Sequence, residues 1–178
     1  QAGERAMLRE GQILYTYLHL APDPAQTKDL VASGATCIAY ETVTDRHGGL
    51  PLLKPMSQVA GRMSVHAGAS ALEKAHGGRG VTVLGGGVVG FNAAQMAVGL
   101  CADVSILDRN PEVLERLAIH FEARAMTRFS NQANLAECVA EADMVIGAVL
   151  LPGAAAPKLV TRDMLGDMQP GAVIVDVA

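Results

Sequence analysis

Hydrophobic residues along the chain form short runs that alternate with amphipathic stretches of helical period. The runs are bounded by Gly, Pro or Asp, and they predict strands at residues 13–20, 37–43, 81–84, 104–107, near 127, 144–149 and 173–177. The stretches between them predict helices at residues 24–32, 56–74, 89–100, 112–124, 134–140 and 161–168. Strands that alternate with helices are typical of a parallel sheet covered by crossover helices. We therefore predict an α/β fold with a doubly wound, Rossmann-type parallel sheet and part of a second α/β domain.

The longest amphipathic stretch, residues 56–74, predicts a boundary between two units, because a helix of this length suits a hinge. Its apolar residues recur on one helical face: Val59, Met63, Ala67 and Ala71. We expect residues 55–77 to form a linking helix between a first domain, residues 1–54, and the Rossmann-type domain, residues 78–178.

Composition narrows the class of protein. The chain has 178 residues, half of them hydrophobic, without an apolar run of about 18 residues that could span a membrane. A net charge of −4, three Phe, three Tyr and no Trp give neither a basic surface nor stacking platforms for nucleic acid. We expect a soluble globular protein that binds neither membranes nor nucleic acid.

The cysteines and the chain ends indicate a cytoplasmic origin. Cys37, Cys101 and Cys138 are far apart and form no C-x-x-C motif, so we expect reduced core residues and no metal site. The first residues carry charges where a signal peptide needs an apolar run. The last strand stops without a following connection, so the sequence is expected to be an internal piece of a longer enzyme.

Glycines interrupt the chain where the predicted strand 81–84 ends. Gly85, Gly87 and Gly90 fit the G-x-G-x-x-G pattern between this strand and a helix, a context that favours a dinucleotide pyrophosphate site. The next strand ends at Asp108, 23 residues after Gly85, where a carboxylate can bind an adenosine ribose. A like charge would repel a 2′-phosphate, so NAD is favoured over NADP, although Arg109 weakens this preference. A tight packing turn and an S-adenosylmethionine site remain alternatives.

A histidine near the end of the first predicted strand is a candidate acid/base. Alternation places Tyr15, Tyr17 and His19 on one strand face, and Pro22 stops the strand. His19 would lie at the carboxyl end, where open α/β sheets bind ligands, and could exchange a proton near neutral pH. A half-exposed histidine without a role is the alternative. The other histidines lack metal-ligand spacing and receive no role: His47, His66, His76 and His120.

Three further stretches are weaker candidates for cofactor contacts. Ser57 stands at a possible helix N-cap before Ala60 and Gly61, which leave the first turn uncrowded. The pair Ser130–Asn131 and the segment 147–160 follow strands on the carboxyl side of the sheet, where a cofactor would lie. Ordinary capping and ordinary turns are the alternatives for these stretches.

Together these stretches resemble the NAD-dependent L-alanine dehydrogenases, which are related to the nucleotide-binding part of proton-translocating transhydrogenase. The resemblance covers essentially the whole chain and rests on "YLHLAPDP", "AYETV", "GGLPLL", "MSQVAGRMS", "VLGGGVVGFNAA", "ILDRN" and "VIGAVLLPGAAAPKLV". It implies interconversion of L-alanine with pyruvate and ammonium, NAD as cofactor, two doubly wound domains with a cleft, and a homo-oligomer, usually a hexamer. Residues 1–54 would then belong to the substrate domain and residues 78–178 to the NAD-binding domain.

The resemblance also implies roles for individual residues. His19 would be the catalytic acid/base, with Tyr17 close to the substrate. The remaining residues would line the NAD site, together with the glycines of the loop: Ser57, Asp108, Ser130, Val149, Leu150, Val177 and Ala178.

The sequence departs from the family pattern at three places. Gly80 joins Val81 directly, where the family usually has a loop of about a dozen residues. Val113 stands where the family can place a basic residue on the cofactor. Substrate-binding and further catalytic residues of the family would lie outside the chain. Alternative functions are a transhydrogenase-like domain, a saccharopine-type or opine-type dehydrogenase, and a nucleotide-binding module without catalysis.

Overall fold

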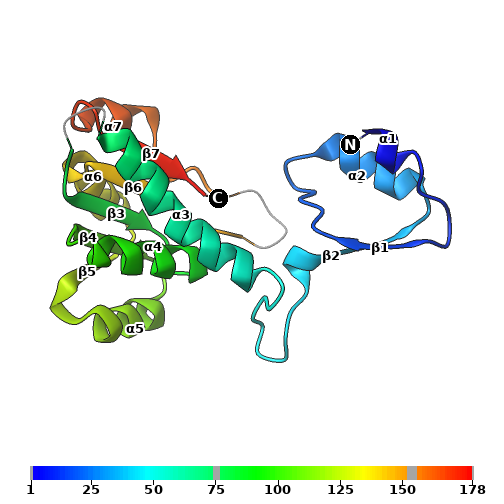
Figure 1. Ribbon diagram of the computed structural model, residues 1–178, viewed down its shortest axis with the longest axis horizontal. Helices are drawn as coiled ribbons and strands as arrows, with labels where there is room; N and C mark the ends of the chain where they lie inside the picture. Colours follow the sequence, from blue (N-terminus) through cyan, green and yellow to red (C-terminus); the bar gives the residue numbers. More distant parts are fainter. Residues whose placement is uncertain (1, 74–76, 152–155, 178) are drawn as a thin grey trace. The chain divides into compact units, whose positions relative to one another are not determined.

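The structure is a computed structural model that describes residues 2–73, 77–151 and 156–177 (Figure 1). The chain divides into two compact units. Unit 1 comprises residues 1–55 and 151–155, and unit 2 comprises residues 56–150 and 156–178. In the described residues, no helix is long and apolar enough to cross a membrane.

Unit 2 is built on a five-stranded parallel sheet in the order β5-β4-β3-β6-β7. The strands are β3 (Gly80–Leu84), β4 (Asp103–Asp108), β5 (Ala125–Phe129), β6 (Met144–Gly147) and β7 (Val173–Asp176). The helices are α3 (Lys54–Leu72), which begins at the end of unit 1, α4 (Val88–Gly99), α5 (Pro111–Phe121), α6 (Gln132–Glu141) and α7 (Arg162–Asp167), with the 3₁₀ turn η2 (Glu122–Arg124). This architecture confirms the doubly wound parallel sheet.

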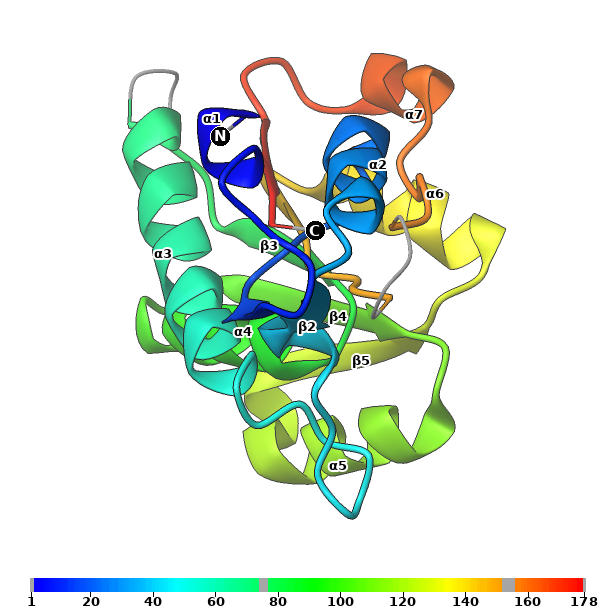
Figure 2. The ribbon, with the colours of Figure 1, turned by 90° about the vertical axis from the view of Figure 1, so that its right-hand side faces the viewer.

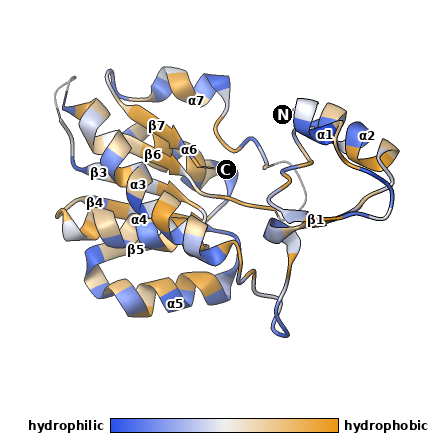
Figure 3. Ribbon diagram, turned by 45° about the vertical axis from the view of Figure 1, so that its right-hand side comes forward, coloured by the Kyte–Doolittle hydropathy of each residue, from blue (hydrophilic) through white to orange (hydrophobic). Residues whose placement is uncertain are grey.

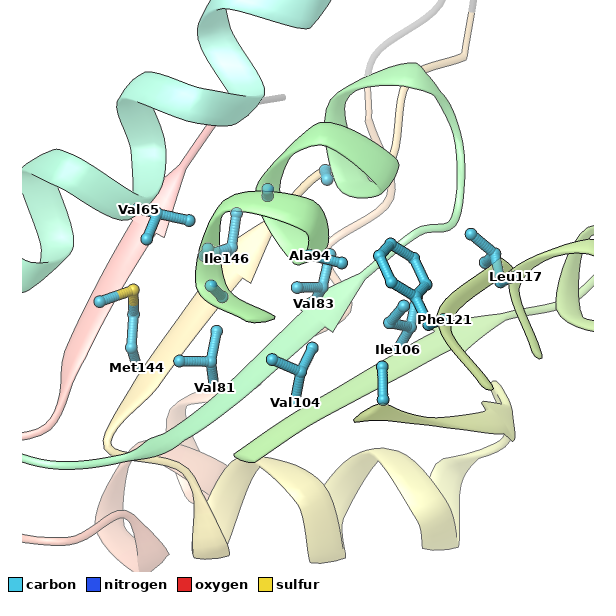
Figure 4. Packing of buried hydrophobic residues seen from close by; sticks show 14 of the residues in the cluster. Val65, Val81, Val83, Ala94, Val104, Ile106, Leu117, Phe121, Met144 and Ile146 are labelled. Carbon is cyan, nitrogen blue, oxygen red and sulfur yellow. The ribbon is translucent and has the colours of Figure 1, made fainter. Parts of the chain in front are cut away.

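Helices cover both faces of this sheet and bury two apolar clusters. On one face, residues of α3, α4 and α5 pack on the strands, for example Val65, Ala94 and Phe121 (Figure 4). On the other face, Leu135 of α6 and Met164 of α7 belong to the second cluster. Successive residues of each strand face opposite sides of the sheet, and both sides are covered, so β6 is apolar along its length, as its orange colour shows (Figure 3).

Local sequence explains where the helices of unit 2 begin. Asn110, Asn131 and Thr161 each accept a hydrogen bond from a backbone N–H in the first turn of α5, α6 and α7. Such N-caps satisfy donors that have no intrahelical partner. Pro111 follows the first of them at a helical position where its missing N–H costs nothing.

Unit 1 contains a two-stranded parallel sheet and short helices. Strand β1 (Ile13–Thr16) pairs with β2 (Thr36–Ala39), and the other elements are α1 (Ala2–Arg5), α2 (Pro24–Ala32) and the 3₁₀ turn η1 (Tyr40–Thr42). Figure 2 shows α1 beside α2, in agreement with an ion pair of 2.8 Å between Arg5 and Asp29. The described residues of unit 1 include three buried apolar side chains: Leu18, Leu30 and Leu53.

Three expectations from the sequence were wrong in detail. Strands were predicted at 13–20 and 37–43, but β1 ends at Thr16 and β2 ends at Ala39. Beyond Thr16, the backbone N–H of Leu18 donates to the carboxylate of Glu41 instead of to a strand, and residues 40–42 form η1.

The second difference concerns the cysteines, which were expected in the core. All three are free, but only Cys138 is buried, whereas Cys101 is exposed. Burial raises the pKa of the Cys138 thiol, and the nearby Arg128 opposes that effect only in part.

The third difference concerns the buried face of α3. The predicted apolar face is exposed, with 62% of Val59 and 55% of Met63 accessible. The buried face consists instead of small residues, Gly61, Ser64 and Gly68 among them, together with Val65 and Leu72. A Cβ on Gly61 would overlap the carbonyl oxygen of Val89 in α4, so close approach of two helix backbones decides which face packs.

Candidate functional site

The candidate cofactor residues of unit 2 lie at the carboxyl edge of its sheet. The glycine loop follows β3, Asp108 ends β4, and Ser130 follows β5. On the other side of β3, Val149 follows β6 and Val177 follows β7. The chain leaves β3 toward β4 and later returns to its other side at β6, which makes this edge a topological switch point, the usual ligand position in such sheets.

The first turn of the glycine loop depends on Gly85. Its φ of +106° lies in the region that side chains rarely adopt, and its N–H donates to the carbonyl of Leu107 at 2.8 Å. A Cβ at this position would lie 2.9 Å from the carbonyl oxygen of Ala148, after β6. Gly85 therefore permits both the turn and the close approach of two neighbouring strand ends.

Gly87 and Gly90 serve different purposes. Gly87 is the N-cap of α4, is exposed, and has no atom within 4 Å of the position of a Cβ. Gly90 is buried, and a Cβ on it would overlap the carbonyl oxygen of Gly85. The loop is thus tightly packed at Gly90 and open at Gly87, beside the unpaired N–H groups of the first turn of α4.

Asp108 joins the end of β4 to the glycine loop. One carboxylate oxygen accepts the N–H of Gly86 at 2.6 Å, and the other accepts the N–H of Asn110 at 2.8 Å. Each carboxylate oxygen has a second lone pair with which it can accept a hydrogen bond from a hydroxyl group. The half-buried carboxylate is thereby oriented while it keeps the capacity to bind a diol.

The remaining residues predicted for unit 2 have distinct surroundings. Ser130 donates its N–H to the carbonyl of Asp108 at 2.9 Å, and Val177 donates its N–H to Gly147 at 2.9 Å. Val149 is half-buried, whereas 48% of Leu150 is exposed. Ala178 lies outside the described residues.

Ser57 is not a helix N-cap, contrary to one interpretation of the sequence. Helix α3 begins at Lys54, so Ser57 lies inside its first turn and is buried, with 8% of its surface accessible. The helix starts earlier than expected because Lys54 already donates its N–H to the carbonyl of Leu50 at 2.9 Å.

The candidate acid/base of unit 1, His19, lies three residues beyond the end of β1. Its side chain is exposed, and its φ of +48° is unusual for a residue with a side chain. The ring of Tyr17 lies nearly parallel to the imidazole, with 6.1 Å between the ring centroids. The Tyr17 hydroxyl donates to the carbonyl of Leu52 at 2.8 Å. The prediction that Tyr17 and His19 lie side by side is confirmed. The prediction that both belong to a strand was wrong, because β1 ends at Thr16.

Two functional candidates escaped the sequence analysis. Gly86 donates its N–H to Asp108, and a Cβ on it would lie 2.6 Å from Leu117 and 2.7 Å from Val113, on α5. Glu41 accepts hydrogen bonds from the backbone of Leu18 and His19. No signal in the sequence marked Glu41, because it lies inside the predicted strand 37–43, whereas in the structure it follows the end of β2.

The environment of Glu41 favours the ionised form of its side chain. Partial burial raises the pKa of Glu41, but backbone N–H groups of His19, Glu41 itself and Leu18, together with the charge of His19, outweigh that effect. The net result is a pKa below the ordinary value of a glutamate.

The residues of unit 2 fit a dinucleotide. The open position over Gly87 and the first turn of α4 suit a pyrophosphate, and Asp108 suits an adenosine ribose. For a metal the result differs: the described residues include no group of three or more His, Cys, Asp or Glu side chains that could hold an ion.

Comparison with known proteins gives matches along the whole chain. Residues 1–60 match the family model "Alanine dehydrogenase/PNT, N-terminal domain", and residues 56–178 match "Alanine dehydrogenase/PNT, C-terminal domain". The alanine dehydrogenase of Halomonas elongata is 59% identical over 191 aligned positions, which cover 100% of this chain and 52% of that protein. Since the chain has 178 residues, 13 aligned positions lack a counterpart in it, about the length of the loop that the family usually has where Gly80 joins Val81 directly here.

Solved structures give the same relationship. An L-alanine dehydrogenase is 47% identical, has a TM-score of 0.83, and is matched over 99% of this chain and 53% of its own. A transhydrogenase from Sinorhizobium meliloti is 31% identical, has a TM-score of 0.76, and is matched over 98% and 55%, respectively. The chain spans about half the length of the relatives it matches. Both family models and the identities over the full chain establish that this protein belongs to the alanine dehydrogenase/PNT family.

Proposed function

We propose that the full protein interconverts L-alanine, NAD⁺ and water with pyruvate, ammonium, NADH and a proton. The observation that carries this proposal is the 59% identity to an alanine dehydrogenase along the entire chain, in which the glycine loop and His19 are both present. Unit 1 would supply part of the substrate domain with its catalytic histidine. Unit 2 would be the NAD-binding domain.

The cofactor would be held by backbone and side-chain groups of unit 2. The N–H groups of the first turn of α4 would bind the pyrophosphate, with Gly87 leaving room for it. Asp108 would accept the ribose hydroxyls and disfavour a 2′-phosphate. Ser57, Ser130, Val149, Leu150, Val177 and Ala178 complete the proposed set. Bound NAD supplies the acceptor for the hydride of the substrate α-carbon.

His19 would carry the proton transfers. Oxidation of the amine is followed by attack of water and departure of ammonia, and both steps need a group that gains and loses a proton near neutral pH. The imidazole of His19 is exposed, so it can reach a substrate, and Tyr17 would line the same site.

The substitution His19→Ala tests this role in the full protein. A general acid/base contributes about 10²–10⁴-fold, so kcat for alanine oxidation should fall by that order. The Kd for NAD should stay unchanged, because the proposed NAD contacts come from unit 2. His47→Ala, which removes another exposed histidine of unit 1, is the matched control and should keep full activity. A near-normal kcat with a lowered melting temperature would make His19 a structural residue.

A transhydrogenase-like activity is the second candidate, favoured by the 31% identity to the transhydrogenase structure. The same preparation should therefore be assayed for hydride transfer from NADH to an NADP analogue. Turnover in that assay without alanine oxidation would reverse the order of the two candidates.

The homo-hexamer expected from the resemblance belongs to the same proposal, and the molar mass measured by light scattering tests it. The cytoplasmic location stays a prediction.

A further inference from the structure

Glu41 and His19 are brought together by the register of β1 and β2. The two strands are parallel and pair Thr16 with Ala39 at their carboxyl ends. Leu18 lies two residues beyond Thr16, and Glu41 lies two residues beyond Ala39. The side chain of Glu41 therefore contacts the backbone of the segment that follows β1, just beyond the last residue pair of β1 and β2.

The carboxylate of Glu41 binds two successive backbone N–H groups. One oxygen accepts the N–H of His19 at 2.6 Å and the N–H of Leu18 at 3.1 Å, and the other oxygen lies 3.2 Å from the N–H of Leu18. Hydrogen bonds to an ionised acceptor are about twice as strong as neutral ones. This arrangement holds the backbone around a histidine whose φ of +48° lies in the left-handed region that side chains disfavour.

Other contacts hold the same segment in place. The side-chain amide of Gln26 donates to the carbonyl of Leu18, whose own side chain is buried. Tyr17 is fixed through its hydroxyl and by the edge-on ring of Tyr40, with 5.1 Å between the ring centroids. Because the residues before His19 are fixed, the direction of the His19 side chain depends on its own backbone conformation. Glu41 holds that conformation by binding the N–H groups of Leu18 and His19.

We propose that Glu41 is a positioning residue that sets the direction of the His19 imidazole by binding the N–H groups of Leu18 and His19. This inference rests on the proposed acid/base role of His19. Glu41 needs no contact with the substrate, because it binds only the backbone of the histidine. A displacement of about 1 Å in a reacting group can cost about 10²-fold in rate, so loss of this support should be visible in kcat.

Three substitutions in the full protein separate the possible contributions of Glu41. Glu41→Met keeps the length of the side chain but removes the acceptor, and kcat for alanine oxidation should fall by about 10²-fold. Glu41→Gln keeps one oxygen that can accept both N–H groups, and it should restore kcat to within about 3-fold of the wild type. Glu10→Met removes an exposed carboxylate of the same unit and should change nothing. The Kd for NAD should be the same in all three variants.

A double-mutant cycle with His19→Ala then distinguishes failure of this inference from failure of the proposed function. If Glu41 acts through His19, Glu41→Met should lower kcat in the wild-type background but not further in the His19→Ala background. Equal losses in both backgrounds, or a glutamine variant as impaired as the methionine variant, would overturn the inference. A normal kcat in His19→Ala alone would instead overturn the acid/base role. If Glu41→Met does not fold, Glu41→Asp, shorter by one methylene, replaces it in the cycle.

Discussion

At the scale of single residues, the four glycines from 85 to 90 are required for different physical reasons. Gly85 adopts a positive φ, Gly86 lies against α5, and Gly90 lies against the carbonyl of Gly85. Only Gly87 has open space where a side chain would be. Three of the four positions therefore serve the packing of the loop, and the fourth leaves room for a ligand.

Gly87 and Gly90 should respond differently to the same substitution. Gly90→Ala forces a methyl group into a backbone carbonyl, and we expect unit 2 to lose about 3 kcal/mol or more of stability. Gly87→Ala should cost less, about 0.5–1 kcal/mol, because alanine is a poorer N-cap than glycine. It should nevertheless weaken NAD binding, since the methyl group points into the open space. Urea denaturation and calorimetric titration with NAD measure the two effects. A Gly87→Ala variant that binds NAD normally would place the pyrophosphate elsewhere.

Asp108 should govern the choice of cofactor. Without its carboxylate, the repulsion of a 2′-phosphate and the acceptor for ribose hydroxyls are both lost, so Asp108→Ala should shrink the preference for NAD over NADP. Asp103→Ala at the opposite, amino end of β4 is the matched control and should leave the ratio of the two Kd values unchanged. Equal or tighter NADP binding by the wild type, measured by calorimetry, would refute the role of Asp108.

At the scale of elements, helix α3 shows that shape and hydrophobicity together choose a buried face. It buries Val65 and Leu72, but where it lies closest to α4 and to the sheet the buried residues are small, and Val59 and Met63 are exposed. Small residues let helix backbones approach closely, which large side chains would prevent.

Enlarging a small residue of α3 should therefore destabilise unit 2. Gly61→Ala places a methyl group on the carbonyl of Val89, and we expect a loss of about 1–3 kcal/mol in the free energy of unfolding. Gly99→Ala, at the end of α4 with nothing within 4 Å, is the control and should be neutral or stabilising. Comparable stability of the two variants in urea denaturation would show that α3 can move away from α4 without loss.

The same elements show how far the sequence can be interpreted. The order of strands and helices was predictable because each parallel strand is a short apolar run between turn residues. The edge that carries Gly85, Asp108 and Ser130 followed from that order, since carboxyl ends of parallel strands lie together. The end of β1 and the contact of Glu41 with His19 were not predictable, because both depend on the register between strands that are distant in sequence.

At the scale of the whole molecule, the two units differ in how much core they bury. The two apolar clusters of the described residues consist of unit 2 side chains from α3 to β7. Unit 1 buries few apolar side chains around a two-stranded sheet, and a sheet of that size is at best marginally stable alone.

A fragment of residues 56–178 should therefore fold without unit 1. We expect a cooperative thermal transition in circular dichroism and retention of NAD binding, because the proposed pyrophosphate and ribose contacts all come from this unit. A fragment of residues 1–55 should show no cooperative transition. A molten fragment 56–178 would mean that its core needs the remainder of the protein.

The position of β3 in the sheet also has a consequence for synthesis on the ribosome. This strand is the first of its sheet to emerge, yet it ends in the centre, with β4 on one side and β6 on the other. Its partner on the second side, residues 144–147, is made about 60 residues later. At about 5–20 residues per second, that edge of β3 stays unpaired for several seconds, and unpaired apolar strand edges are where chains associate wrongly. The nascent chain is consequently most exposed to aggregation, and to chaperone binding, in the interval before β6 emerges.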